Sequence, residues 1–84
     1  NYGRLGVMGL EDVCTPVSRA NARPGDLVFF VGTYDAPYPD RPTHVGIYVG
    51  NGMMIHCGSP ISYANINTPY WQEHFYAFGR LREP

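Results

Sequence analysis

Two histidines, His44 and His56, are the side chains of this 84-residue chain best suited to acid–base chemistry. They lie near the outer ends of two short runs that flank the Gly-Asn-Gly sequence at residues 50–52. A histidine titrates near neutral pH, and a second polar group that holds one ring nitrogen fixes its tautomer, as a general base requires. Whether the two histidines meet depends on how the two runs pair.

Alternating apolar and polar positions predict that residues 44–49 and 53–57 form an antiparallel hairpin. With a two-residue loop, the two histidines would lie on opposite faces, and each face would mix polar with apolar groups. With a three-residue loop, residues 50–52, Ile47 pairs with Ile55 and one face becomes wholly apolar. A slip of one residue moves every side chain to the other face, so burial favours the three-residue loop.

In this register the two histidines are diagonal neighbours on one face, and we expect them within direct or one-water hydrogen-bond reach. Gly46 lies between them on that face, and its missing side chain leaves room for a ligand, which makes it a candidate substrate-binding residue. Gly52 is expected at positive φ in the last position of the loop. Cys57 points to the apolar face, where we expect it to be buried and chemically unreactive.

Neither of the two cysteines is a good candidate nucleophile. Cys14 precedes Thr15-Pro16, and only a short turn fits before residue 23, so no long helix can lend its positive end to a thiolate. We expect both cysteines to be small buried hydrophobes, and the sequence leaves open whether they pair with each other. Since no C-x-x-C or H-E-x-x-H pattern occurs, we expect no metal site and no cofactor.

Composition limits the classes of partner. The net charge is −1, and the six basic residues are scattered arginines, which argues against nucleic-acid binding through phosphates. No apolar run approaches the roughly 20 residues that cross a membrane. A chain of 84 residues makes one small domain with a thin core.

The other elements follow from turn residues and periodicity. Pro24-Gly25 has the residues of a type II turn, and it precedes an apolar run at 26–31 that predicts a central strand. Asp26 is expected to accept hydrogen bonds from the amides of this turn. The remaining expected elements are short: a helical turn at 7–13, a strand at 61–66, a helix from Thr68-Pro69 to about residue 73, and a last strand at 75–82. Together they predict an α+β fold with a mainly antiparallel sheet.

Residues 32–42 form a long loop rich in proline, tyrosine and aspartate. Loops of this length near a site often shape substrate entry. Tyr34 and Asp35 are therefore candidate substrate-binding residues, with a solvated loop as the alternative. Trp71 is expected to anchor the short helix in the core rather than to serve as a sugar platform, and His74 to be a capping or surface residue.

Several ordered motifs of the chain resemble the NlpC/p60 family of cell-wall cysteine peptidases. They are Arg-Pro-Gly-Asp-Leu-Val-Phe-Phe at 23–30, Thr-His-Val-Gly-Ile-Tyr-Val-Gly at 43–50, Met-Ile-His at 54–56 and Phe-Gly-Arg-Leu at 78–81. The resemblance covers about residues 1–82 and looks closest to hydrolases carried by conjugative elements of Gram-positive bacteria. It implies a papain-like fold, a secreted or wall-associated protein, and cleavage of γ-D-glutamyl–diamino acid bonds in peptidoglycan stem peptides. By position, it implies His44 as the base and His56 as the residue that orients it.

The family's nucleophile lies in an Asp-Cys-Ser-Gly motif upstream of what is here residue 1, and that motif does not occur in these 84 residues. We therefore expect residues 1–84 to be the later two-thirds of one NlpC-type domain, without its catalytic helix and inactive alone. An apolar strip should be exposed where that helix belongs, which favours marginal stability or dimerisation.

Two other functions remain open from the residues. The first is a non-catalytic remnant that binds cell-wall peptides or serves only as a folding unit. The second is a zinc site built from the two histidines and a third ligand. Zinc prefers three or four nitrogen or sulfur ligands, and the histidine face offers no cysteine, which disfavours the zinc site.

Overall fold

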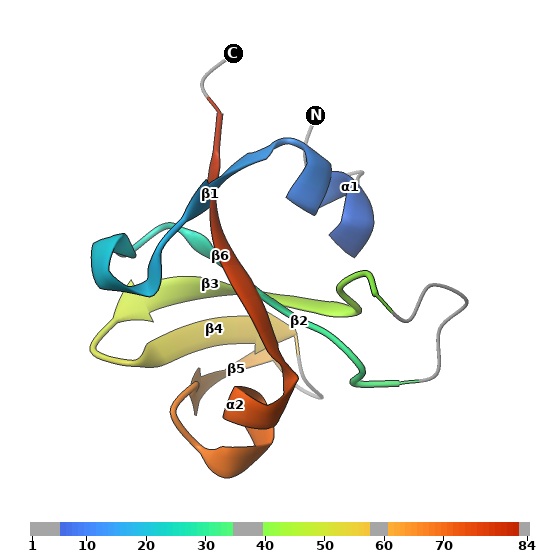
Figure 1. Ribbon diagram of the computed structural model, residues 1–84. Coiled ribbons are helices and arrows are strands. Elements are labelled where there is room, and N and C mark those ends of the chain that lie inside the picture. Colours follow the sequence, from blue (N-terminus) through green and yellow to red (C-terminus); the bar gives the residue numbers. More distant parts are fainter. Residues whose placement is uncertain (1–5, 35–39, 58–60, 83–84) are drawn as a thin grey trace.

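The computed structural model describes residues 6–34, 40–57 and 61–82. These residues form a six-stranded sheet in the order β1-β6-β2-β3-β4-β5, with every neighbouring pair antiparallel. The strands are β1 (Cys14–Val17), β2 (Leu27–Phe30), β3 (His44–Gly50), β4 (Met53–Cys57), β5 (Ile61–Asn65) and β6 (Phe75–Leu81). The helices are α1 (Val7–Asp12), the 3-10 helix η2 (Arg19–Asn21) and α2 (Pro69–His74). The predicted α+β fold with a mainly antiparallel sheet is confirmed (Figure 1).

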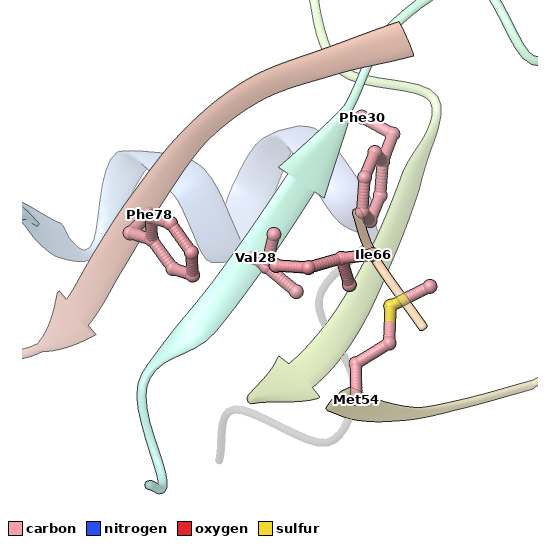
Figure 2. Packing of buried hydrophobic residues seen from close by; sticks show 5 residues of the cluster. All are labelled: Val28, Phe30, Met54, Ile66 and Phe78. Carbon is pink, nitrogen blue, oxygen red and sulfur yellow. The ribbon is translucent and has the colours of Figure 1, made fainter. Parts of the chain in front are cut away.

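Strand β2 lies inside the sheet between β6 and β3, as its two apolar faces predicted. All four of its residues are buried. Val28 and Phe30 belong to a cluster on one face of the sheet, completed by Met54, Ile66 and Phe78 (Figure 2). Leu27 and Phe29 belong to a second cluster with Cys14, and α1 packs against it through partly buried apolar side chains.

The β3–β4 hairpin has the predicted register over most of its length. Its pairs are Gly46 with His56, Ile47 with Ile55, and Tyr48 with Met54. At the tip the register shifts, so that Gly50 pairs with Met53 and Val49 is the extra residue. The loop therefore has two residues, Asn51 and Gly52, and the predicted three-residue loop is wrong in this detail.

A bulge reconciles the short loop with the separation of faces. Asn51 has φ 56° and Gly52 has φ 75°, the sign that a type I′ turn requires at both central positions. Gly50, next to the extra residue, has φ 92°. The bulge absorbs one residue, so a two-residue turn and the register that collects apolar side chains on one face coexist. The positive φ predicted for Gly52 is confirmed.

Two elements differ from the prediction. The chain around Cys14 forms an edge strand, β1, rather than a short turn only. Pro16 is tolerated there because an edge strand does not need every amide for pairing. Thr68 precedes α2 as predicted, but its side chain makes no capping hydrogen bond. Instead its carbonyl accepts the first helical bond, from the amide of Gln72 at 2.9 Å.

The start of β2 is fixed by Asp26, whose side chain is 5% exposed. The predicted turn is present: Gly25 has φ 97°, and the amide of Asp26 donates to the carbonyl of Arg23 at 3.0 Å. The carboxylate accepts the Arg23 amide at 2.8 Å, as expected. It also accepts two bonds from the Arg80 guanidinium of β6, at 2.8 and 2.9 Å, which the sequence did not indicate. This guanidinium is the main reason that the pKa of Asp26 is lowered.

Candidate active site

The histidines of β3 and β4 meet on one face of the sheet. His44 Nε2 lies 2.9 Å from His56 Nδ1, within direct hydrogen-bond distance. The two imidazole rings are nearly perpendicular, at 82°, with centroids 5.1 Å apart. Because the register places His56 opposite Gly46, His44 is its diagonal neighbour, and the predicted hydrogen-bond reach is confirmed.

Aromatic side chains surround this pair of histidines. Trp71 of α2 stacks on His44, with centroids 5.5 Å apart and planes at 23°, and contacts His56 edge-on at 5.2 Å. Phe30 of β2 lies 6.3 Å from the His44 ring and 4.6 Å from the indole. Trp71 packs against the core as predicted, but its contact with both histidines was missed. No local sequence signal carries that contact, since Trp71 lies on a separate element well beyond the hairpin in the chain.

Burial among these rings lowers the pKa of His44 below its ordinary value of 6.5, and the neighbouring His56 adds to the effect. Desolvation penalises the imidazolium, so His44 is held neutral at neutral pH. With Nε2 directed at His56, the ring nitrogen Nδ1 is the position at which His44 can accept a proton from a third group. The pair therefore has the geometry of a general base and its orienting partner.

Two threonines hold the chain immediately before His44. The Thr43 amide donates to the carbonyl of Phe30 at 2.8 Å, which begins the pairing of β3 with β2. Across the loop, the hydroxyls of Thr33 and Thr43 lie 2.6 Å apart, and the Thr33 amide donates to the Thr43 hydroxyl at 3.1 Å. These bonds fix the start of β3 and so the backbone of His44. Sequence reasoning missed this bridge, which joins Thr33 near the start of the predicted loop to Thr43 directly after it.

On the histidine face, the space beside Gly46 is filled by the Met54 side chain. A Cβ atom at this position would lie 2.5 Å from the Sδ atom of Met54 and 3.2 Å from the carbonyl oxygen of Ile55. Met54 is fully buried, and its side chain fills the room that we expected between the histidines. The packing against Met54 favours glycine here, and it corrects the inference that Gly46 leaves room for substrate on the histidine face.

The other candidate site residues have separate outcomes. Tyr34 is 63% exposed, beyond the Thr33–Thr43 bridge. Asp35 lies outside the described residues, so the substrate-binding role of both stays a prediction. His74, expected as a capping or surface residue, is half-buried, and its Nδ1 lies 2.8 Å from the carbonyl oxygen of Val31. It joins the end of α2 to the residue that follows β2.

Both cysteines carry free thiols. Cys14 is buried, as expected, and desolvation raises the pKa of its thiol. Cys57 is exposed, so the expectation that it is buried is wrong. It does lie on the predicted face, paired with Ile61 of β5 and on the opposite side of β4 from His56.

Cys57 is exposed because it lies on a face of the sheet that the described residues leave partly uncovered. Alongside α1 and over β3, β4 and β5, this face is an apolar groove of about 460 Å³. Its lining includes Leu10, Val45, Ile47, Ile55, Cys57 and Ile61. Ile47 is 48% exposed and Ile61 is 67% exposed. An exposed apolar strip is therefore present, and its assignment to the place of the catalytic helix stays a prediction. The alternation that placed Cys57 on this strip gave no information about what covers it.

Two findings concern other classes of site. Within the described ranges, no His, Cys, Asp or Glu side chains form a group of three that could hold a metal ion. Of the helices in those same ranges, none is long and apolar enough to cross a membrane.

Comparisons with known proteins agree on one family. Residues 9–80 match the NlpC/P60 family. The chain is 46% identical over 67 residues to the bifunctional muramidase/DL-endopeptidase CwlT of Bacillus subtilis, covering 79% of this chain and 20% of that protein. It is 44% identical over 68 residues to the probable endopeptidase p60 of Listeria seeligeri, covering 80% and 12%. It is 37% identical over 76 residues to the murein DD-endopeptidase MepH of Escherichia coli, covering 82% and 25%.

Solved structures give the same result. An NLP/P60 family protein of Staphylococcus aureus, described as similar to lipoprotein, superposes with a TM-score of 0.87 at 33% identity, covering 94% of this chain and 26% of that one. An NlpC/P60 family protein of Bacillus cereus gives a TM-score of 0.73 at 26% identity, covering 90% and 25%. The chain spans a quarter or less of the length of the three curated relatives.

Proposed function

Because the chain belongs to the NlpC/P60 family, we propose that it carries the histidine part of the active site of a cysteine endopeptidase acting on peptidoglycan. The bond proposed for cleavage is the γ-D-glutamyl–diamino acid bond of stem peptides. The observation that carries the proposal is the 2.9 Å contact between His44 Nε2 and His56 Nδ1. Among the relatives, the higher identity to a protein named a DL-endopeptidase than to one named a DD-endopeptidase supports this choice of bond.

His44 is assigned as the general base and His56 as its orienting partner. His44 donates its Nε2 proton to Nδ1 of His56, which leaves Nδ1 of His44 to remove the proton of an attacking thiol. The thiolate attacks the amide carbon, and the His44 imidazolium then protonates the leaving amine. Water hydrolyses the resulting thioester with His44 again as base. The lowered pKa of His44 suits the first step, because the base must be neutral to accept a proton.

The thiol is proposed to come from a segment outside these 84 residues. Cys14 is buried and belongs to the cluster beneath α1, on the other face of the sheet from the histidines. Cys57 lies on the opposite side of β4 from His56. Residues 1–84 are thus proposed to be part of one NlpC-type domain and inactive alone, with the longer protein secreted or wall-associated. Tyr34 and Asp35, which follow β2 in the sequence, are proposed to contact the stem peptide.

The test compares two proteins on the same purified muropeptides. One is the 84-residue chain, and the other is extended upstream, from the source gene, through the expected Asp-Cys-Ser-Gly segment. Products are identified by mass spectrometry, which distinguishes γ-D-glutamyl cleavage from cleavage elsewhere in the stem. We expect cleavage by the extended protein only, blocked by iodoacetamide. Cleavage by the short chain that iodoacetamide does not block would refute a cysteine mechanism, and peptide binding by an extended protein that never cleaves would favour the non-catalytic alternative.

Variants of the extended protein test the assigned roles. His44→Ala should abolish hydrolysis, and His56→Ala should reduce it while the protein remains folded. Cys57→Ser is the matched control, because it alters the residue next to His56 on the opposite face and should leave turnover unchanged. Near wild-type turnover by His44→Ala would show that the base is misassigned.

A further inference from the structure

We infer that Trp71 is a positioning residue for the histidine pair: its indole fixes the orientation of the His44 ring so that Nε2 stays directed at His56. The inference rests on the proposed function for its catalytic meaning, but the orientation itself is a property of the described residues. It concerns a side chain of α2, which is far from the hairpin in sequence and against it in space.

Three rings form one closed contact. The His44 ring is stacked on the indole at 5.5 Å and is perpendicular to His56 at 5.1 Å, while His56 contacts the indole edge-on at 5.2 Å. Stacked and edge-to-face pairs at these separations are each favourable beyond the apolar area that they bury. Rotation of either imidazole would break one of these contacts together with the bond between the histidines.

The helix that carries Trp71 is itself held by hydrogen bonds at two of its residues. The Gln72 side-chain amide donates to the carbonyl of Ile66 at 2.7 Å, and its oxygen accepts from Arg19 of η2 at 3.2 Å. Two residues further, the His74 carbonyl accepts the amide of Val31 at 2.7 Å, and its Nδ1 meets the Val31 carbonyl at 2.8 Å. Bonds at the two positions that flank Glu73 thus hold a helix of six residues in one place. These bonds hold the backbone of Trp71 in place, and the indole therefore stays against the His44 ring.

The position of the indole matters because a single hydrogen bond does not fix the orientation of an imidazole that water can reach. Water competes for Nε2 of His44 and Nδ1 of His56, and a ring with open space beside it can rotate about its χ2 torsion. The stacked indole instead covers one face of the His44 ring, so the space into which that ring would rotate is filled. Removing it frees the ring that the proposed mechanism needs in one orientation, and small misplacements of a catalytic group cost up to about 100-fold in rate.

The test measures the hydrogen bond between the histidines directly. In the ¹⁵N-labelled 84-residue chain, NMR detects the scalar coupling between His44 Nε2 and His56 Nδ1 across the bond, and the exchange of the shared proton with water. We expect the coupling in the wild type and in Trp71→Phe, which keeps an aromatic ring. We expect its loss, with fast proton exchange, in Trp71→Leu and in Trp71→Met, which fill the space without a ring. Circular dichroism identifies which variants fold, and one folded protein of the pair Trp71→Leu and Trp71→Met is enough for the test.

Phe75→Leu is the matched control. Phe75 packs against the same core cluster and contacts Phe30 and Phe78, and its ring contacts include neither histidine. It should lose stability yet keep the coupling, which separates positioning from a general loss of packing. A folded Trp71→Leu or Trp71→Met protein that keeps both the coupling and the slow exchange would overturn the inference, as would loss of the coupling in Phe75→Leu.

A kinetic arm uses the extended protein. There Trp71→Leu should lower kcat by about 10- to 100-fold with KM little changed, and Trp71→Phe should restore most of kcat. An extended protein that fails to cleave muropeptides would refute the proposed function and leave the NMR result standing. An active protein whose kcat is unaffected by Trp71→Leu would refute the role of Trp71 and leave the proposed function standing.

Discussion

The close packing of Gly46 against Met54 gives a prediction that can be worked through in numbers. In Gly46→Ala, the new methyl would lie 2.5 Å from Met54 Sδ and 3.3 Å from Met54 Cγ. The thioether must move, yet Met54 is fully buried in the same cluster as Ile66 and Phe30, so its movement disturbs the packing of that cluster. Overpacking of this kind costs about 1–3 kcal/mol. A domain of this size is expected to have roughly 4–13 kcal/mol in total, so the loss is measurable without unfolding the protein.

A second substitution isolates the cause. Met54→Val removes Sδ and Cε, and hence the 2.5 Å contact, while retaining a strand-forming apolar residue. Alone it leaves a small cavity and should cost about 1–2 kcal/mol. In the double variant, the methyl group introduced by Gly46→Ala occupies part of that cavity. The two losses should therefore be less than additive, with a coupling of about 1 kcal/mol or more.

Urea unfolding followed by circular dichroism measures the four proteins of this cycle. With a slope of about 1–3 kcal/mol per molar urea, a loss of about 2 kcal/mol shifts the midpoint by roughly 1 M. Unchanged slopes would show that the native states are equally compact. The reasoning fails if Gly46→Ala is as stable as the wild type, or if the double variant loses the full total of the two single losses.

Other expectations concern thiols and titrating groups. A thiol reagent should label Cys57 rapidly in the folded chain and Cys14 only upon unfolding, and a single slow phase for both thiols would contradict their placement. Asp26→Asn should cost about 1–3 kcal/mol by weakening the bonds to Arg80. Since the pKa of Asp26 is lowered in the folded chain, its contribution to the free energy of unfolding is present above pH 3.8 and is lost as the pH falls through the folded pKa. The stability of Asp26→Asn should therefore depend less on pH in this acid range. An unchanged pH dependence would argue against the ion pair. The pKa of His44 is also lowered, so below about pH 6.5 the unfolded chain binds a proton that the folded chain does not. The free energy of unfolding should therefore fall as the pH drops below this value. His44→Gln should make this fall less steep, and urea midpoints at several pH values would show it.

The sequence predicted those features that depend on periodicity and on local turn chemistry. Alternation with period two favoured the observed pairing of Ile47 with Ile55, because a slip of one residue would have mixed polar and apolar groups on each face. The same alternation predicted that His44 and His56 share a face. The apolar run of β2 predicted a central strand, and Pro24-Gly25 predicted the turn before it. Each inference used residues that are neighbours in the chain or across one hairpin.

The wrong predictions concern features that depend on how side chains pack or on a local irregularity of the strands. Cys57 was placed on the correct face but wrongly expected to be buried, because alternation assigns a face and says nothing about what packs on it. Gly46 was interpreted as empty space, whereas the length of the Met54 side chain fills it. The one-residue bulge at Val49 was missed, because a bulge leaves the pattern of the flanking strands intact.

Periodicity and turn residues determined the α+β class, and the local pattern determined which two imidazoles face one another. Only the tertiary structure decided what surrounds them. Trp71 and Phe30 reach the His44 ring from α2 and β2, and Arg80 reaches Asp26 from β6 across 54 residues of sequence. Contacts of this kind depend on strand order and on where a short helix docks. These are set by the packing of the whole core, which no local stretch of sequence specifies.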